Sequence, residues 1–238
     1  PQCRPCPSGL CSCCSPWSRC RNSVRRWSWA PRRTWSGIRR WCLLPSPVST
    51  VSTCNLSALG WRSAVSTLAT LKPAFDKRSG QGTLTAGNST NLSDGASAAL
   101  LSSEHWAQAN GKEIQAYLAD AQVAAVDFVG GDGLLMAPAW AVAQLLQRNN
   151  LKLQDFDFYE IHEAFAAQSL AVMNTLGLDA EKVNPMGGAI ALGHPLGATG
   201  AIRSATVIHA LQRHQLKYGM VTMCVGMGQG AAGIFERV

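Results

Sequence analysis

Two glycine-framed segments near the end of the chain place the strongest constraint on its fold. Asn184–Gly200 reads NPMGGAIALGHPLGATG, and Cys224–Gly230 reads CVGMGQG. Glycine adopts backbone conformations that other residues avoid, and it lets backbone amide groups approach a bound molecule closely. Each segment also carries one side chain that can transfer a proton. We therefore expect the chemistry of this protein at junctions where strands end and helices begin.

His194 is the first candidate catalytic residue. Gly187 and Gly188 precede it, and Pro195 fixes the backbone that leads into a predicted helix. The N-terminus of a helix favours developing negative charge, and an imidazole with a pKa of about 6.5 exchanges protons at neutral pH. A lone histidine is more often an ordinary core or surface residue. The glycine and proline neighbours favour the catalytic interpretation here.

Cys224 is the second candidate. It ends an apolar run, and Gly226, Gly228 and Gly230 follow at alternate positions. A buried structural cysteine is the alternative interpretation. Glycines weaken a strand, however, so packing alone does not explain three of them in this place. A thiol with a pKa of about 8.5 can exchange a proton with a carbon acid when a partner lies close.

A third candidate is the segment Tyr159–Ala166, which reads YEIHEAFA. We interpret it as a strand-to-helix corner with His162 and Glu163 at its tip. The alternative is an ordinary helix N-terminus with a carboxylate in its first turn. The residues alone leave both interpretations open.

Strands that alternate with helices predict an α/β layered fold. Helices are expected over Glu104–Ala109, Pro138–Arg148, Glu163–Leu176 with Gly177 as its end, and Ala198–His214. Strands are expected over Ile114–Asp127, Phe156–Ile161, Gly219–Val225 and Ala231–Arg237. Ser93–Ser103 is expected to form a small-residue helix or a buried turn that leads into a strand.

Residues 1–65 have a different composition from the rest of the chain. They hold eight of the nine cysteines, six of the eight tryptophans and ten arginines, but no lysine and no acidic residue. This mixture is what GC-rich coding DNA yields in a wrong reading frame. We interpret residues 1–65 as an aberrant, low-structure leader that arises from a frameshift or a mispredicted start, with authentic sequence from about Ser66.

Other interpretations of this leader stay open. Cys3-x-x-Cys6 and Cys11-x-Cys13-Cys14 hint at zinc, but no second CxxC pair follows at finger spacing. A disulfide-rich secreted module, a membrane-binding or nucleic-acid-binding Arg/Trp segment and a transit peptide are further possibilities. The secreted module would need an apolar stretch with a cleavage site, which is missing. Prolines and serines interrupt the helical stripe that an Arg/Trp binding segment would need. The cysteines, the six tryptophans and the lack of an amphipathic period are unlike a transit peptide.

The remainder of the chain is ordinary globular sequence. Without the leader, 11 basic and 14 acidic residues remain, a net charge of −3, so the basic charge of the whole chain does not indicate a nucleic-acid partner. No run of 18 apolar residues predicts a membrane span. Cys224 is the one cysteine of this part, which favours a reducing, cytoplasmic location.

Four motifs in order resemble the thiolases, the family of acetyl-CoA acetyltransferase and 3-ketoacyl-CoA thiolase. They are GTLTAGNSTNLSDG at 82–95, HEAFA at 162–166, GHP at 193–195 and CVGMGQG at 224–230. The resemblance covers about residues 66–238. It implies a layered α-β-α-β-α fold, incomplete here: 66–111 would be a remnant of the loop domain and the end of the N-terminal half, and 112–238 the C-terminal thiolase domain.

The resemblance also assigns roles to particular residues. His194 resembles the histidine that activates the nucleophilic cysteine and lines an oxyanion hole, and Cys224 the cysteine that moves a proton at the acyl α-carbon. Gly226 resembles the glycine whose amide contributes to the other oxyanion hole. Thr90 stands where the family places a serine near the pantetheine arm of CoA, and Ala164 and Phe165 resemble residues that line the tunnel for this arm.

This chain departs from the family pattern in two ways. The nucleophilic cysteine of the family lies in the first half, in a segment that this chain lacks, and no leader cysteine sits in a recognisable version of its motif. His162 stands where the commoner NEAF motif has asparagine. HEAF resembles the β-subunit type of fatty-acid-oxidation thiolases, which is compatible with a longer acyl chain.

The resemblance implies a CoA-dependent acyltransferase that cleaves 3-ketoacyl-CoA or condenses acetyl-CoA units. Its substrates would be CoA thioesters, with no permanently bound cofactor or metal, and the intact protein would be a homo-oligomer. Without the nucleophile, we expect this chain alone to be inactive. Two alternatives stay open: a non-catalytic CoA-binding half that another chain completes, and a basic cysteine-rich module fused to a degenerate enzyme domain.

Overall fold

The computed structural model describes residues 41–44 and 68–238, all within one compact unit, Gly37–Val238. Its centre is a six-stranded mixed sheet with the strand order β2-β1-β3-β6-β5-β4. The strands are β1 (Trp41–Leu44), β2 (Leu100–Ser102), β3 (Ala116–Ala125), β4 (Phe158–Ile161), β5 (Tyr218–Gly226) and β6 (Gln229–Arg237). Neighbouring strands in this order run antiparallel, except β4 and β5, which run parallel.

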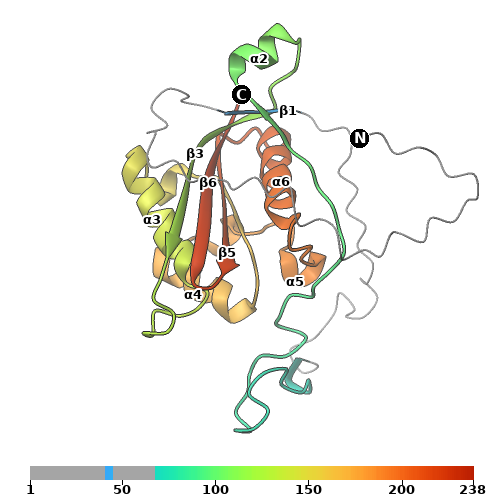
Figure 1. Ribbon diagram of the computed structural model, residues 1–238, viewed down its shortest axis with the longest axis vertical. Coiled ribbons are helices and arrows are strands. Elements are labelled where there is room, and N and C mark those ends of the chain that lie inside the picture. Colours follow the sequence, from blue (N-terminus) through green and yellow to red (C-terminus); the bar gives the residue numbers. More distant parts are fainter. Residues whose placement is uncertain (1–40, 45–67) are drawn as a thin grey trace, which may run out of the picture. The chain divides into compact units, whose positions relative to one another are not determined.

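Helices lie on both faces of this sheet, and α3 and α6 flank the strands in Figure 1. The helices are α2 (Glu104–Ala109), α3 (Ala137–Asn149), α4 (Ala166–Leu176), α5 (Ala189–Leu192) and α6 (Thr199–Arg213). Two short 3₁₀ helices lie in the connections: Leu153–Asp155 between α3 and β4, and Ala180–Lys182 between α4 and α5. Local signals set several of the ends: the Ser103 hydroxyl accepts from the Trp106 amide at the start of α2, and Gly177 ends α4 with a φ of 68°.

The alternation of side chains along each strand divides the core into two layers. Met220 of β5 and Ile234 of β6 pack with α3, whereas the next residues, Val221 and Phe235, pack with α6. Burial of each large apolar side chain stabilises the fold by about 1.5–3 kcal/mol. The described part of the chain is therefore a helix–sheet–helix arrangement, which confirms the predicted α/β class.

Most predicted elements are confirmed, with ends that agree or shift by no more than three residues. The helix predicted from Glu163 is wrong in its start: α4 begins at Ala166, because Phe165 has an extended backbone with φ −143° and ψ 147°. The helix considered for the first part of Ser93–Ser103 does not form, since regular structure begins only with β2 at Leu100. In the described residues, no helix is long and apolar enough to cross a membrane.

Part of the predicted leader belongs to the sheet. The four residues of β1 pair with β2 on one side and with β3 on the other, and Cys42 and Leu43 are buried. The structure thus describes one strand within the segment interpreted as a low-structure leader, and that interpretation stays a prediction for the rest of residues 1–65. An apolar run of four residues can bury between two strands without any longer sequence pattern. The candidate zinc cysteines before Trp41 lie outside the described residues.

Limited digestion with the nonspecific protease proteinase K, followed by mass spectrometry, tests whether β1 belongs to the sheet. Because Cys42 and Leu43 are buried between two strands, Trp41–Leu44 should survive, in the main product or as a bound peptide. Leu43→Asp should release this segment, and Val129→Asp, at a position 84% exposed, should not. A product of the unaltered chain that begins between Ser66 and Lys77 and has lost Trp41 would instead support the unstructured leader.

Candidate active site

The candidate catalytic residues gather at the end of the parallel pair β4 and β5. His162 follows directly after β4, and its backbone N–H donates to the carbonyl of Thr222 in β5 at 2.9 Å. Cys224 lies two residues beyond Thr222, about 7 Å further along the strand. In α/β sheets the crevice outside the carboxyl ends of the strands is the usual place for a ligand.

His162 and His194 lie against each other. Their ring centroids are 4.0 Å apart with an angle of 42° between the ring planes. His194 sits between α5 and α6, and its backbone N–H donates to the carbonyl of Asn91 at 3.0 Å. Gly193 has a φ of 90°, and a Cβ there would overlap the Ser93 hydroxyl, so only glycine suits this approach. The structure thus brings two residues together that lie 32 positions apart in the sequence.

Both imidazoles are held in the neutral form at neutral pH. His162 is 1% exposed. Burial, followed by the nearby His194 and the charge of Arg203, lowers its pKa to about 3. Burial and then Arg203 also lower the pKa of His194. Neutral imidazole has one free nitrogen lone pair, so either ring can accept a proton from a reacting group.

A buried ion pair lies beside the histidines. Arg203 of α6 donates to Glu160 of β4 at 2.8 Å, and the two side chains are 2% and 0% exposed. Arg203 Nη1 also donates to the carbonyl of Gly187 at 3.3 Å. Burial raises the pKa of Glu160 to about 7, although the Arg203 charge opposes this rise. We did not predict this pair from the sequence. Its one signal there is Glu160, an acidic residue within an otherwise apolar strand.

Glu163 has a structural contact that the sequence-based interpretation missed. Its carboxylate accepts from the Asn184 side chain at 3.0 Å and from the backbone N–H of Ile190 at 3.1 Å. A Cβ at Gly188 would overlap this carboxylate. Glu163 therefore stabilises the start of α5, in the segment that precedes His194, and not the first turn of α4.

The three residues predicted to contact CoA lie together. The backbone N–H of Thr90 donates to the carbonyl of Ala164 at 3.1 Å, and its hydroxyl donates to the carbonyl of Ala189 at 2.7 Å. Ser89 forms a β-bridge with Phe165, whose ring packs edge-on against Phe75 with centroids 5.6 Å apart. Thr90 thus joins the HEAF corner to the segment that carries His194.

Cys224 is 7% exposed and lies opposite Gly230 of β6. Burial raises the pKa of its thiol, so it carries its proton at neutral pH. The register of β5 and β6 shifts between Cys224 and Gly226, and Gly226 has a φ of 92°. An irregularity of this kind redirects the side chains around it. The structure places both residues at the β5–β6 turn.

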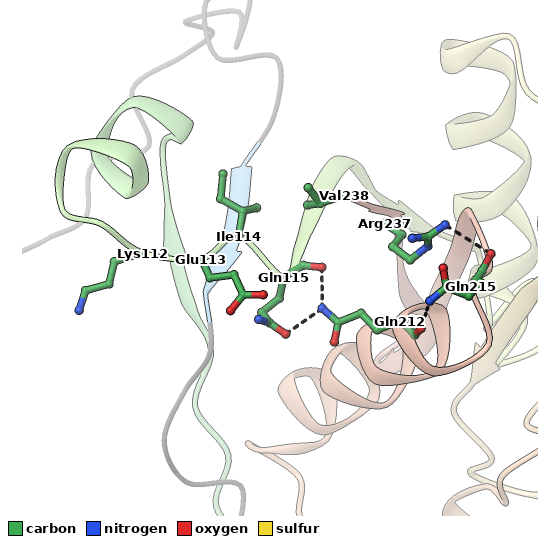
Figure 2. A pocket seen from close by; sticks show the side chains of 8 residues that line it. All are labelled: Lys112, Glu113, Ile114, Gln115, Gln212, Gln215, Arg237 and Val238. Carbon is green, nitrogen blue, oxygen red and sulfur yellow. Dashed lines mark hydrogen bonds between the residues drawn. The ribbon is translucent and has the colours of Figure 1, made fainter.

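The described residues hold no candidate metal centre, and they form a cavity that lies away from the histidine pair. Among residues 41–44 and 68–238, no group of three or more His, Cys, Asp and Glu side chains is arranged to hold a metal ion. A cavity of about 420 Å³ lies at the other end of α6, where Gln212, Gln115 and Arg237 line it (Figure 2). It shares no residue with the histidine pair.

The family description of the thiolase C-terminal domain matches residues 112–237, and that of the thiolase N-terminal domain matches residues 58–105. The chain belongs to the thiolase family. The division of this thiolase chain at residues 65 and 111 stays a prediction, as do the roles of its individual site residues.

Individual thiolases are similar over the same part of the chain. A 3-ketoacyl-CoA thiolase of Serratia proteamaculans is 48% identical over 179 residues, which are 73% of this chain and 44% of that protein. The human mitochondrial 3-ketoacyl-CoA thiolase in complex with CoA matches 74% of this chain and 43% of its own, with a TM-score of 0.68 and 37% identity. The dimeric peroxisomal thiolase of Saccharomyces cerevisiae matches the same shares with a TM-score of 0.65 and 41% identity. The chain thus spans less than half the length of these relatives.

We predict that acid destabilises this thiolase chain partly through His162. Below pH 6.5 the unfolded His162 takes up a proton, whereas the folded one does so only near pH 3, so the free energy of unfolding falls as the pH falls, by at most about 1.4 kcal/mol per pH unit. Glu160 acts in the opposite direction between its usual pKa of 4.5 and about 7. The effect of His162 is therefore measured as the difference in pH dependence between the unaltered chain and a variant that lacks this side chain.

Urea unfolding at a series of pH values measures this effect. Between about pH 5 and 6.5, His162→Asn should lose stability less steeply than the unaltered chain as the pH falls. His209→Asn, at an exposed position of α6, should keep the original slope. Equal slopes for His162→Asn and the unaltered chain would show that His162 is not held neutral.

Proposed function

We propose that this chain is the acid–base half of a CoA-dependent acyltransferase that cleaves 3-ketoacyl-CoA thiolytically or condenses acetyl-CoA units. The observation that carries the proposal is the contact of His162 with His194 at 4.0 Å. It lies beside the cluster of Thr90, Ala164 and Phe165, which we propose to contact the pantetheine arm. The similarity to 3-ketoacyl-CoA thiolases supports the same chemistry.

Each residue has a separate task in this proposal. Neutral His194 accepts the proton of the nucleophilic thiol. In thiolysis the resulting thiolate attacks the 3-keto carbonyl carbon of 3-ketoacyl-CoA, and the bond to the α-carbon breaks. In condensation it attacks the thioester carbonyl of acyl-CoA, and CoA thiolate leaves. Cys224, protonated at neutral pH, donates a proton to the α-carbon of the leaving acyl-CoA in thiolysis. In condensation it first gives its proton to the departing CoA thiolate, and its own thiolate then removes a proton from the α-carbon of the incoming acyl-CoA. The Gly226 amide and the His162 and His194 rings stabilise the oxyanions that form.

The nucleophilic cysteine is proposed to come from outside the described part of this chain. Cys42 and Cys224 are the described cysteines, and both are buried. We propose that the chain alone has no turnover. We also propose that the completed protein is a homo-oligomer, which the dimeric state of the Saccharomyces cerevisiae thiolase supports. A reducing, cytoplasmic location is part of the same proposal.

A second candidate function is a non-catalytic half that binds CoA or stabilises a partner chain. The contacts of Thr90 with Ala164 and Ala189, in the cluster proposed to hold the pantetheine arm, support it. Addition of a separately produced N-terminal thiolase half distinguishes the two candidates. Turnover in the mixture supports the acid–base half, whereas CoA binding without turnover supports the alternative.

The first prediction is that the purified chain does not cleave acetoacetyl-CoA. Acyl transfer to a thiol needs an activated cysteine within reach of His194, and we propose that this cysteine is supplied by another segment. A spectrophotometric thiolysis assay with an intact thiolase as the positive control measures this. Cleavage by the chain alone at the rate of the intact enzyme would contradict the prediction.

The second prediction concerns the protein completed with its N-terminal half. His194→Ala and Cys224→Ala should each lower kcat by about 10²–10⁴-fold, the usual contribution of a general acid or base. His194→Ala should also slow alkylation of the nucleophile by iodoacetamide, because less thiolate is present. Cys224→Ala should leave alkylation unchanged and block condensation. Equal loss of alkylation in both variants, with condensation retained, would overturn these roles.

A further inference from the structure

Thr199, the first residue of α6, contacts His194 directly. Its hydroxyl oxygen lies 2.6 Å from Nδ1 of His194 and 2.9 Å from the carbonyl oxygen of Pro195. Thr199 is 1% exposed, so no solvent competes for these contacts. The hydroxyl therefore lies between one imidazole nitrogen and one backbone oxygen.

The chemistry of the three groups decides which one donates. A threonine hydroxyl has one hydrogen to donate, and a carbonyl oxygen has none. A threonine hydroxyl in a helix characteristically donates to the carbonyl four residues earlier, which is Pro195 here. The hydrogen of Thr199 is then used, and its oxygen can only accept from Nδ1. Burial lowers the pKa of His194, so the ring carries a single N–H at neutral pH.

We propose that Thr199 is a positioning residue that holds His194 in the tautomer protonated at Nδ1, which leaves Nε2 as the proton acceptor. This inference deepens the proposed function, on which it rests for the use made of that acceptor. The tautomer itself is a property of the chain, independent of turnover.

The position of Thr199 is fixed from a second side. Arg203 follows it by four residues, so the two side chains leave the same face of α6. Arg203 is paired with buried Glu160 of β4 at 2.8 Å. The first turn of α6 therefore cannot shift along β4 without breaking this ion pair. His194 is held by the same turn at a constant distance from the strand that carries His162.

Nitrogen-15 NMR of the labelled full chain tests the proposal, with His194 assigned by its loss in His194→Gln. The unaltered chain should show His194 with its proton on Nδ1. Thr199→Val keeps the side-chain shape and removes the acceptor, so the signals should move toward the tautomer protonated on Nε2. Thr199→Ser should restore the original signals. Thr206→Val is the matched control, because its hydroxyl donates to the carbonyl of Ile202 at 3.0 Å in the same helix.

The outcomes separate this proposal from the proposed function. The role of Thr199 is overturned, whatever the activity, if the unaltered chain carries the His194 proton on Nε2. It is also overturned if Thr199→Val gives the same His194 signals as the unaltered chain. In the completed protein, Thr199→Val should lower kcat by about 10²-fold, the lower range for loss of a general base, with KM nearly unchanged. The expected tautomers in a completed protein without any turnover would support Thr199 and overturn the proposed function.

Discussion

The buried ion pair between Glu160 and Arg203 holds the two elements on which the site depends. Two buried charges are costly unless each has its partner, and loss of one partner alone destabilises a protein by about 3–5 kcal/mol. The pair therefore sets the position of α6 along β4. Because His162 follows Glu160 by two residues and Thr199 precedes Arg203 by four, the supports of both histidines are fixed by one contact.

A segment from the part of the chain matched to the N-terminal thiolase domain provides the second constraint. Through its backbone, this segment bonds to Ala164 in the HEAF corner and to His194. The hydroxyl of Thr90 reaches Ala189, at the start of α5. These contacts hold the HEAF corner and the histidine loop together, so the site is built from both matched parts of the chain. In this chain, residues 112–237 alone do not contain every support of the two histidines.

Local sequence patterns predicted most of the elements, and their failures have specific physical reasons. Glu163 has the position of a helix-start carboxylate, but its better partners, Asn184 and the Ile190 amide, come from 21 and 27 residues away. Ser93–Ser103 has small residues that suit a helix, yet its first residue bonds instead with the His194 loop. Trp41–Leu44 has no period at all, and its place in the sheet depends on two strands distant in sequence.

The sequence by itself determined the α/β class, the order of the helices and strands after Ser103 apart from α5, the family and the identity of the candidate residues. Each of these rests on local periodicity or on a short motif. Tertiary structure alone decided that His162 lies against His194, that the Thr199 hydroxyl lies 2.6 Å from Nδ1 of His194, and that Arg203 pairs with Glu160. These contacts join residues from different elements. Their geometry depends on how α6 packs on the sheet, and no local pattern encodes that packing.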